Sequence, residues 1–411
     1  MKILIAADVY PPEVSSAANL MAELAEGLVK RGHAVTVVTS YPRHYLTDAS
    51  KGKTFLSRET VHGVDVLRVK TLPLHKVNYI VRGISQLILP FLFFRAVKRS
   101  VQNGVDAVII YSPPLPLAVL GVLVKRRYKA RFLLNLQDIF PQNAIDLGIL
   151  TIKPLIMFFE WIEKIVYKRA DVITFHSPGG RKFLIEKKGV PSEKIVTLMN
   201  WVDVDSYQRF PNITPPFRER YHLANKFIFL FAGIFGPAQG LEFLMRVARE
   251  VQDISDIVFL LVGDGVEKEK MTRLVSEWKL KNVIIQPFIP QTEYPALVHE
   301  SDVGVVCLSE KNKTSFVPGK LLGYLAAGKP AVSFLNKESD GFEVMRDAQC
   351  GYASVAGDLS AAVSLVRKMY SERTTLAKLG ESGLAYARKN LALDSCLEKI
   401  EKLVASPNHA A

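Results

Sequence analysis

The chain repeats one pattern twice: short runs rich in β-branched and aromatic residues alternate with longer stretches of helical periodicity. The predicted strands are residues 2–8, 34–40, 107–111, 131–136, 172–175 and 195–199 in the first half, and 227–232, 257–263, 283–287, 303–308 and 331–334 in the second. Strands that alternate with helices form parallel βαβ units. Because 411 residues exceed what one core usually serves, the pattern predicts an α/β fold of two Rossmann-like parallel-sheet domains.

A polar stretch that contains prolines, residues 203–216, separates the two series and has no periodicity. Such a stretch is typical of an interdomain connection. We therefore place the first domain at residues 1–205 and the second at residues 206–385. A final helical stretch, residues 374–404, is expected to extend back across the first half, so that residues 386–411 return to the N-terminal domain.

The charge of the chain favours phosphate-bearing partners. Lys and Arg outnumber Asp and Glu by 53 to 40, which gives a net charge of +13. A positive protein attracts nucleotides, anionic lipids or nucleic acid. The positive charge is spread along the chain and no nucleic-acid-binding module is recognisable, so we do not expect nucleic-acid binding.

The cysteines and the apolar runs indicate in which cellular compartment the protein is expected. Cys307, Cys350 and Cys396 are far apart and lack metal-ligand spacing, so neither a disulfide framework nor a zinc site is expected, and a reducing cytoplasmic compartment fits best. The first apolar run is interrupted by Asp8 and is interpreted as a strand, not a signal peptide. The uncharged apolar run of residues 87–94 is much shorter than the ~20 residues of a spanning helix.

Two stretches combine apolar and basic side chains. In residues 78–99, apolar side chains stand beside Arg82, Arg95, Lys98 and Arg99, and a basic amphipathic helix of this kind can lie in the headgroup plane of a membrane. We expect this stretch to contact lipid. Residues 155–169 could also face lipid, but there we expect the large apolar side chains to belong to the core, namely those of Met157, Phe158, Trp161 and Ile165.

Glycines gather where the predicted strand 227–232 meets its helix. Gly233, Gly236 and Gly240 lie in the segment AGIFGPAQGLEFL. Glycines let a backbone approach a phosphate, and the following helix start offers unpaired amides to the anion. The alternative is a tight βα turn without a ligand. The spacing differs from the GxGxxG fingerprint, so a nicotinamide cofactor is not expected.

A lysine stands in the first turn of a later predicted helix. Lys320 follows Pro318, a residue suited to a helix start, and precedes the apolar residues 321–327. The helix dipole disfavours a cation at that position. A bound anion would explain the lysine; the alternative is that its side chain points to solvent.

Polar residues in the first half follow predicted strands. Asp138 comes after strand 131–136, at the carboxyl edge where open parallel sheets bind ligands. The alternative role for Asp138 is an N-cap of the next helix. The loop after the first strand carries Glu13, Ser15 and Ser16, which could line the same edge.

The chain resembles the retaining glycosyltransferases of family 4, specifically the WbuB-like group that transfers N-acetylated amino sugars such as N-acetylfucosamine in bacterial O-antigen or capsule assembly. The resemblance runs nearly end to end. It rests on segments that occur in this order: DVYPPE, LAEGLVKRGHAVTVVT, QDIFPQNAIDLGIL, YKRADVITFHSPG, FAGIFGPAQGLEFL, FLLVGDG and VPGKLLGYLAAGKPAV.

The resemblance implies a GT-B fold, in which two Rossmann-like domains face each other across a cleft. It implies catalytic roles for Lys320, beside the leaving nucleotide, and Asp138, beside the transferred sugar or the acceptor hydroxyl. The donor would contact Gly233, Gly236, Gln239, Gly240, Gly263, Phe288, Ile289, Lys313, Ser315, Phe316 and Val317. Cleft residues on the acceptor side would be Glu13, Ser15, Ser16 and His176. The family needs no metal and no cofactor, because basic residues and helix dipoles stabilise the diphosphate.

The sequence departs from the family pattern at several places. The family's pair of glutamates aligns with Ser315 and Gly323, and no Asp or Glu occurs from residue 311 to residue 336. The glycine pair of the first loop is replaced by Ser15 and Ser16, and residues 233–240 lack the usual Arg/Lys pair. Lys320 therefore carries more of the expected positive charge, together with Lys313.

The expected function is transfer of an N-acetylated deoxyamino sugar from a UDP-sugar to a polyprenyl-diphosphate-linked acceptor, with retention of configuration. The protein would be cytoplasmic and peripheral on the inner face of the cell membrane. Two alternatives share the fold: a nucleotide-sugar 2-epimerase, which needs no acceptor, and a non-catalytic nucleotide-sugar-binding accessory protein.

Overall fold

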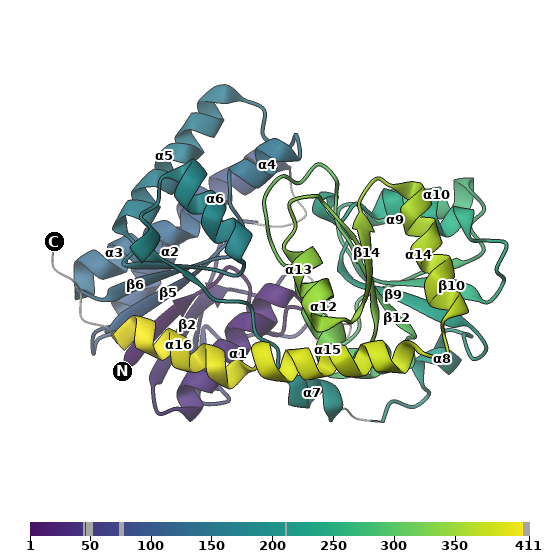
Figure 1. Cartoon of the computed structure of the whole chain (residues 1–411). Coiled ribbons are helices and arrows are strands. Elements are labelled where there is room, and N and C mark those ends of the chain that lie inside the picture. The colour runs from purple at the N-terminus through teal and green to yellow at the C-terminus, as the bar shows by residue number, and fades with distance from the viewer. Residues whose placement is uncertain (44–45, 47–51, 74–77, 210–211, 406–411) are drawn as a thin grey trace. The chain divides into compact units, whose positions relative to one another are not determined.

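The computed structural model (Figure 1) describes the chain except residues 44–45, 47–51, 74–77, 210–211 and 406–411. The chain divides into two compact units: the first comprises residues 1–200 and 393–411, and the second comprises residues 201–392. The sequence placed these boundaries after residues 205 and 385.

The first unit is built on an eight-stranded sheet with the order β3-β4-β2-β1-β5-β6-β7-β8. Its strands are β1 (Lys2–Ala6), β2 (Ala34–Ser40), β3 (Arg58–Val61), β4 (Val64–Val69), β5 (Ala107–Ser112), β6 (Arg131–Leu136), β7 (Val172–Phe175) and β8 (Ile195–Thr197). Only the edge pair β3 and β4 is antiparallel among the described pairs. Every residue of β5 is buried, as expected for a parallel sheet with helices on both faces.

Helices cover both faces of this sheet (Figure 1). α1 and α16 pack together on one face, while α3 packs against both α2 and α5 on the other. The helical elements are α1 (Ser16–Lys30), α2 (Tyr79–Ser100), η2 (Leu115–Leu117), α3 (Ala118–Tyr128), α4 (Gln142–Asp146), α5 (Lys153–Arg169), α6 (Pro178–Lys188), η3 (Ser192–Lys194) and α16 (Leu393–Ala405).

The second unit contains a six-stranded sheet with the order β11-β10-β9-β12-β13-β14. All of its described pairs are parallel, and its strands are β9 (Phe227–Ile234), β10 (Ile257–Asp264), β11 (Val283–Gln286), β12 (Val303–Cys307), β13 (Ala331–Leu335) and β14 (Gly351–Val355). Its helical elements are α7 (Val204–Gln208), α8 (Phe217–Arg220), η4 (Pro237–Gln239), α9 (Leu241–Glu250), α10 (Lys268–Glu277), η5 (Gln291–Glu293), α11 (Tyr294–Glu300), α12 (Gly319–Ala326), α13 (Gly341–Ala348), α14 (Leu359–Ser371) and α15 (Leu376–Asn390).

A buried tyrosine fixes α12 on the sheet of the second unit. The hydroxyl of Tyr324 donates to the carbonyl oxygen of Leu230 in β9 over 2.8 Å. A Cβ atom at Gly304 in β12 would overlap the Tyr324 ring, so glycine is needed there for close packing. This contact sets the position of the first turn of α12, which carries Lys320.

Two expectations about helices need correction. Residues 203–216 are not wholly irregular, because Asp203 caps α7 by accepting from the amide of Ser206; residues 210–211 of that stretch lie outside the described residues. The final helical stretch is broken around residues 391–392 into α15 and α16. As expected, its last part belongs to the first unit, where α16 lies beside α1 (Figure 1).

The sequence missed β3, β4 and β14. The edge strand β3, with the sequence RETV, is polar and half exposed, while β14, with the sequence GYASV, has few large apolar side chains and no fully buried residue. Strand signals come mainly from buried β-branched and aromatic residues. The edge strands β3 and β14 therefore carry little pattern, and this reason does not apply to the inner strand β4.

The prediction that the outer residues of α5 are core residues is wrong for three side chains. Met157, Phe158 and Trp161 are exposed, while Ile165 is partly buried. The inward face is formed instead by Phe159, Ile162, Glu163, Val166 and Tyr167. The helix is thus apolar on both sides near its start.

All three cysteines are buried and free. Among the described residues, none of the helices combines the length and the apolar character that crossing a membrane requires.

Candidate functional site

Lys320 is directed at the loop that follows β9. Its Nζ atom donates to Gln239 Oε1 over 2.5 Å and lies 4.7 Å from the centre of the Phe231 ring. A Cβ atom at Gly233 would lie 2.9 Å from Lys320 Cε. The structure therefore brings the predicted residues Gly233, Gln239 and Lys320 together, and the alternative of a solvent-pointing lysine does not hold.

The surroundings of Lys320 oppose its charge. Burial lowers the pKa of the Lys320 ammonium to about 8, and only the nearby Cys307 acts in the other direction. None of the described carboxylates forms an ion pair with this lysine. A desolvated cation without a counter-charge is unfavourable, so an anion placed beside Lys320 would stabilise its charged form.

Two helix starts meet at the same place. α9 begins after Gly240 and α12 begins after Pro318, and neither start is capped by a described side chain. Uncapped helix starts present free amides and the positive end of the helix dipole. Gln239 ends η4 and is separated from α9 only by Gly240, so its bond to Lys320 joins the two starts. Together they form a positive group at the carboxyl edge of β9.

Glycines permit the close packing of this edge. Gly240 has a φ of 59°, and a Cβ atom there would lie 2.8 Å from the Leu308 carbonyl oxygen. A Cβ atom at Gly263 would overlap the carbonyl oxygen of Gly233 in the neighbouring strand. Gly236 precedes η4 and is partly buried, and a Cβ atom there would make only an ordinary contact with Ile234.

The other predicted donor residues lie in two loops. Ile289 is buried and Phe288 partly buried in the loop after β11, while Val317 is buried just before α12. Ser315 and Phe316 are partly buried, and the Phe316 carbonyl oxygen accepts from Ser339 Oγ over 2.9 Å. Lys313 is exposed and donates to the Glu310 carbonyl oxygen over 3.3 Å. Lys313 therefore contacts its own loop, and no described contact brings it to Lys320.

A tyrosine lies beside Gly323, one of the two positions at which the family pattern described above expects a glutamate. A Cβ atom at Gly323 would lie 2.9 Å from the hydroxyl oxygen of Tyr207 in α7. The Tyr207 ring packs edge-on against Tyr294, with 6.0 Å between the ring centres. A side chain at position 323 would require the Tyr207 hydroxyl to move, so the two positions share one space.

In the first unit, Asp138 lies in a cluster of acidic groups. It follows β6 and is partly buried, and burial raises the pKa of its carboxyl group to about 6. Burial also raises the pKa of Tyr111 at the end of β5, and the charges of Asp138 and Asp8 raise it further. Side chains at the carboxyl ends of β1, β5 and β6 therefore gather at one place.

Asp138 does not cap the helix that follows it. The N-cap of α4 is Pro141, and no described side chain caps that start. The alternative structural role for Asp138 is therefore excluded. Its carboxyl group remains available, and burial raises its pKa to about 6, so that it is mostly ionised at neutral pH.

An amide pair holds the segment before Asp138. The Gln137 side chain and the Asn200 side chain exchange two hydrogen bonds, of 3.0 and 2.7 Å, and Gln137 Nε2 also donates to Asn135 Oδ1 over 2.6 Å. His176, a predicted cleft residue, is buried at the end of β7, with its Nε2 atom 3.1 Å from the Gln137 carbonyl oxygen. His176 thus supports the Asp138 segment.

The first loop is held by other contacts than those expected. Ser15 caps α1 by accepting from the amide of Ala18 over 3.1 Å, and Ser16 is exposed in the first turn. Glu13 is buried and accepts from the Arg43 amide over 3.1 Å. Ser15 therefore has a structural role at the start of α1.

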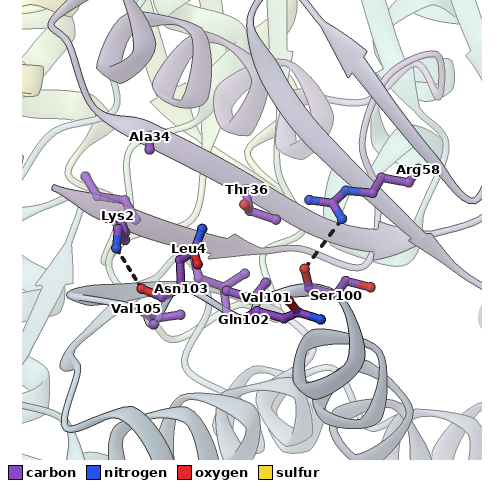
Figure 2. A pocket seen from close by; sticks show the side chains of 12 residues that line it. Lys2, Leu4, Ala34, Thr36, Arg58, Ser100, Val101, Gln102, Asn103 and Val105 are labelled. Atoms are coloured by element: carbon purple, nitrogen blue, oxygen red, sulfur yellow. Dashed lines mark hydrogen bonds between the residues drawn. The ribbon is translucent and has the colours of Figure 1, made fainter.

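A small cavity at the opposite edge of the first sheet has a different character (Figure 2). It encloses about 170 Å³ and is lined by the starts of β1 and β2 and by residues 100–105. Its cations are satisfied, since Lys2 Nζ donates to the Asn103 carbonyl oxygen over 2.7 Å and Arg58 Nη1 donates to the Ser100 carbonyl oxygen over 3.4 Å (Figure 2). Arg58 also pairs with Asp65 over 2.8 Å. Parallel sheets bind ligands at their carboxyl edges, so this cavity is not the candidate site.

Metal-ligand clusters are not found in the part of the chain that the structure describes: nowhere there do three or more His, Cys, Asp or Glu side chains gather in a way that could hold an ion. The positive charge at the candidate site comes from Lys320 and the two helix starts.

Sequence reasoning missed several residues of the two edges, namely Asp8, Tyr111, Asn200 and Tyr207. The first two follow or end parallel strands, and the rule that strand ends converge could have identified them. Asn200 and Tyr207 could not be found in this way, because their roles depend on long-range packing with Gln137 and Gly323.

Two family models match the chain, one in each unit. A glycosyl transferase 4-like domain matches residues 17–201, and a domain of the glycosyl transferases group 1 matches residues 226–372. A similar curated protein is the putative colanic acid biosynthesis glycosyl transferase WcaI of Escherichia coli, 25% identical over 91% of this chain and 96% of WcaI.

Solved structures share the fold at low sequence identity. Sucrose-phosphate synthase from Thermosynechococcus elongatus has a TM-score of 0.76 at 16% identity and covers 98% of both chains. HepE of Anabaena, solved in complex with UDP-glucose, has a TM-score of 0.73 at 15% identity and covers 99% of this chain and 100% of HepE. With two parallel-sheet units, a positive group at one sheet edge and glycosyl transferase domains matched in both halves, the chain is a glycosyltransferase of the GT-B fold.

Proposed function

We propose that the chain transfers a sugar, an N-acetylated deoxyamino sugar, from a UDP-linked donor to a polyprenyl-diphosphate-linked acceptor, with retention of configuration and without a metal. The product would be a unit of a surface polysaccharide. The observation that carries the proposal is the joined group of Lys320, Gln239 and the starts of α9 and α12.

This group supplies what departure of a nucleoside diphosphate requires. As the bond between the anomeric carbon and the β-phosphate oxygen breaks, negative charge develops on that oxygen. Preorganised cations and helix amides stabilise such charge without reorganisation. Lys320 lies at this point without a carboxylate partner among the described residues, so its full charge is available to the leaving diphosphate.

UDP is the proposed carrier for two reasons. The GT-B neighbour HepE was solved with UDP-glucose, and the loop of Phe288 and Ile289 lies after β11 in the same sheet, where its backbone groups could hold a uracil base. Polysaccharide assembly is proposed because WcaI is named for colanic acid biosynthesis.

Asp138 is the proposed acceptor-side residue. With a pKa of about 6, its carboxyl group is mostly ionised at neutral pH and can accept a hydrogen bond from the acceptor hydroxyl or the donor sugar. In the proposed reaction the acceptor oxygen attacks the face from which UDP departs, and its proton passes to the leaving phosphate oxygen. No covalent intermediate with the protein forms.

The test combines nucleotide binding with turnover. The protein is screened against UDP, GDP, dTDP and their sugars by thermal shift, then incubated with bacterial membranes and the sugars that bind. We expect stabilisation by UDP, UDP release that depends on acceptor, and an unchanged anomeric configuration by NMR. Release of UDP with no acceptor present, together with an isomerised sugar, would assign the chain to the epimerases instead.

A matched pair of variants separates the roles of the two units. Asp138→Asn should reduce kcat by about 100-fold or more and leave the UDP-induced thermal shift intact. Glu186→Gln, at an exposed carboxylate in α6 of the same unit, should change neither. Full activity of Asp138→Asn would contradict the assignment of Asp138.

A further inference from the structure

The start of α5 and the turn before it expose an unusual number of large apolar side chains. Met157 is 69% exposed and Trp161 is 60% exposed. The same surface includes Ile149, Ile152, Leu155 and Phe158, and we call these six residues the α5 surface. Contiguous exposed apolar patches of this kind mark interaction sites. Figure 1 shows α5 at the upper edge of the first unit.

The α5 surface is held in place by the opposite face of the helix. Phe159 is buried and packs edge-on against Phe140, with 4.9 Å between the ring centres. On the outer face, Trp161 stacks on Phe158 with 6.2 Å between the ring centres. The outward apolar side chains are therefore presented by a helix anchored in the core.

Cations accompany the α5 surface. Four cations along α5 are exposed, namely Lys153, Lys164, Lys168 and Arg169. Within this helix, which the structure describes in full, Glu160 is the one exposed carboxylate. Glu163 is buried and pairs with Lys188 over 3.0 Å. Met157, Trp161, Lys164 and Lys168 are separated by steps of three or four residues, so they share one helix face. The face is apolar near its start and cationic toward its end.

The helix α2 repeats this arrangement. Ile84, Ile88 and Phe91 are exposed at helical spacing, and the exposed Arg95 and Lys98 continue the same face. α3 packs against both α2 and α5, which places the two helices in one layer. Each helix leads from one parallel strand toward the next, so both begin at the carboxyl edge of the sheet, the edge that carries Asp138.

We infer that the α5 surface, with the outer face of α2, docks the protein on an anionic lipid bilayer. The apolar helix starts enter the acyl boundary and the cationic helix ends lie at the headgroups. A bilayer is the favoured binding partner because the exposed apolar side chains of α5 stand beside four exposed cations, and only one exposed carboxylate occurs on this described helix. This pattern suits anionic lipid. The inference deepens the proposed function, since a polyprenyl-linked acceptor is held in a membrane.

The test uses the full chain with vesicles of phosphatidylcholine alone or mixed with phosphatidylglycerol. We expect sedimentation with the mixed vesicles, and a blue shift of Trp161 fluorescence, because Trp201 is buried and Trp278 is partly buried. The double variant Met157→Ser/Trp161→Ser should partition at least about tenfold more weakly. Val266→Ser, at a side chain 68% exposed in the second unit, should partition like the natural protein.

Charge and self-association are tested separately. Lys164→Gln/Lys168→Gln/Arg169→Gln should lose the preference for phosphatidylglycerol. Circular dichroism checks that each variant is folded. Equal vesicle binding by the Met157/Trp161 variant would overturn the inference. So would concentration-dependent self-association that this variant abolishes, without vesicle binding, because the occupant would then be a second copy.

The two proposals fail in different ways. UDP binding and UDP release with a detergent-solubilised acceptor need no vesicles. Vesicle binding without turnover of any UDP-sugar would reject the proposed function alone, and turnover without vesicle binding would reject the docking surface alone.

Discussion

Lys320 and Asp138 share a property at the scale of single residues: each ionisable group is held where its charged form is disfavoured. Burial lowers the pKa of Lys320 to about 8 and raises that of Asp138 to about 6. Such opposed shifts are common at functional sites. A ligand that supplies the missing partner would remove the penalty, so stability and binding are linked at these positions.

The linkage gives a prediction for Lys320→Met. The unfolded lysine binds its proton with the ordinary pKa of 10.5 and the folded one with a pKa of about 8, so the unfolded state holds more protons between these values and stability rises with pH in that window. Removing the charge should stabilise the ligand-free protein at pH 7 by on the order of 1–3 kcal/mol. Thermal unfolding at pH 7 measures this.

The same variant should lose its response to UDP. In the natural protein, UDP affinity should fall as the pH rises through about 8, because the ammonium then loses its proton. Lys337→Met, at an exposed lysine, is the control and should show neither effect. A less stable Lys320→Met that keeps the UDP-induced shift would contradict the role of Lys320.

At the scale of elements, the junction of α7 and α12 shows how one helix constrains another. Tyr207 in α7 fills the space beside Gly323 in α12, so the sequence of α12 depends on a residue more than a hundred positions away in the chain. The space available at position 323 is therefore set by a side chain on another helix.

Gly323→Glu should therefore destabilise the protein by about 1–3 kcal/mol, the usual effect of overpacking. The double variant Tyr207→Ala/Gly323→Glu should recover part of that loss, since the space is then free. Urea unfolding of both single variants and the double variant gives the coupling free energy, expected at about 0.5–3 kcal/mol. Purely additive effects would mean that Tyr207 and Gly323 do not share the space.

Elements also show what the sequence could and could not predict. Buried central strands such as β2 and β6 were predicted to the residue, because their apolar runs reflect burial on both faces. The core assignment of Met157 and Trp161 was wrong, because periodicity shows that a helix has an apolar face but not whether protein covers it. The pairing of Lys320 with Gln239 follows from the strand order, which joins loops distant in the chain.

At the scale of the whole molecule, the chain ends on the unit where it began. α16 buries Leu397, Ile400 and Val404, and Glu401 accepts hydrogen bonds from His33 and Arg31, each over 2.8 Å. The first unit is therefore completed only by the last helix, so its stability depends on the C-terminal residues.

Deletion of residues 393–411 should destabilise the first unit by about 5 kcal/mol, since several large apolar side chains lose their burial. The second unit should keep its UDP-induced thermal shift. In calorimetry, the unfolding temperatures of the two units should therefore lie farther apart in the shortened chain than in the intact chain. Deletion of residues 406–411 alone is the control. Unfolding of both units together after the larger deletion would contradict this division.

The buried cysteines have a practical consequence. The Cys307 thiol donates to the Gly240 carbonyl oxygen over 3.3 Å, and burial raises the pKa of that thiol to about 12. Alkylating reagents attack thiolates, so this sulfur can react only when the turn before α9 moves away from it. Slow alkylation of Cys307 would thus report movement of that turn, and a single cysteine introduced on the surface should be labelled much faster than the three buried ones.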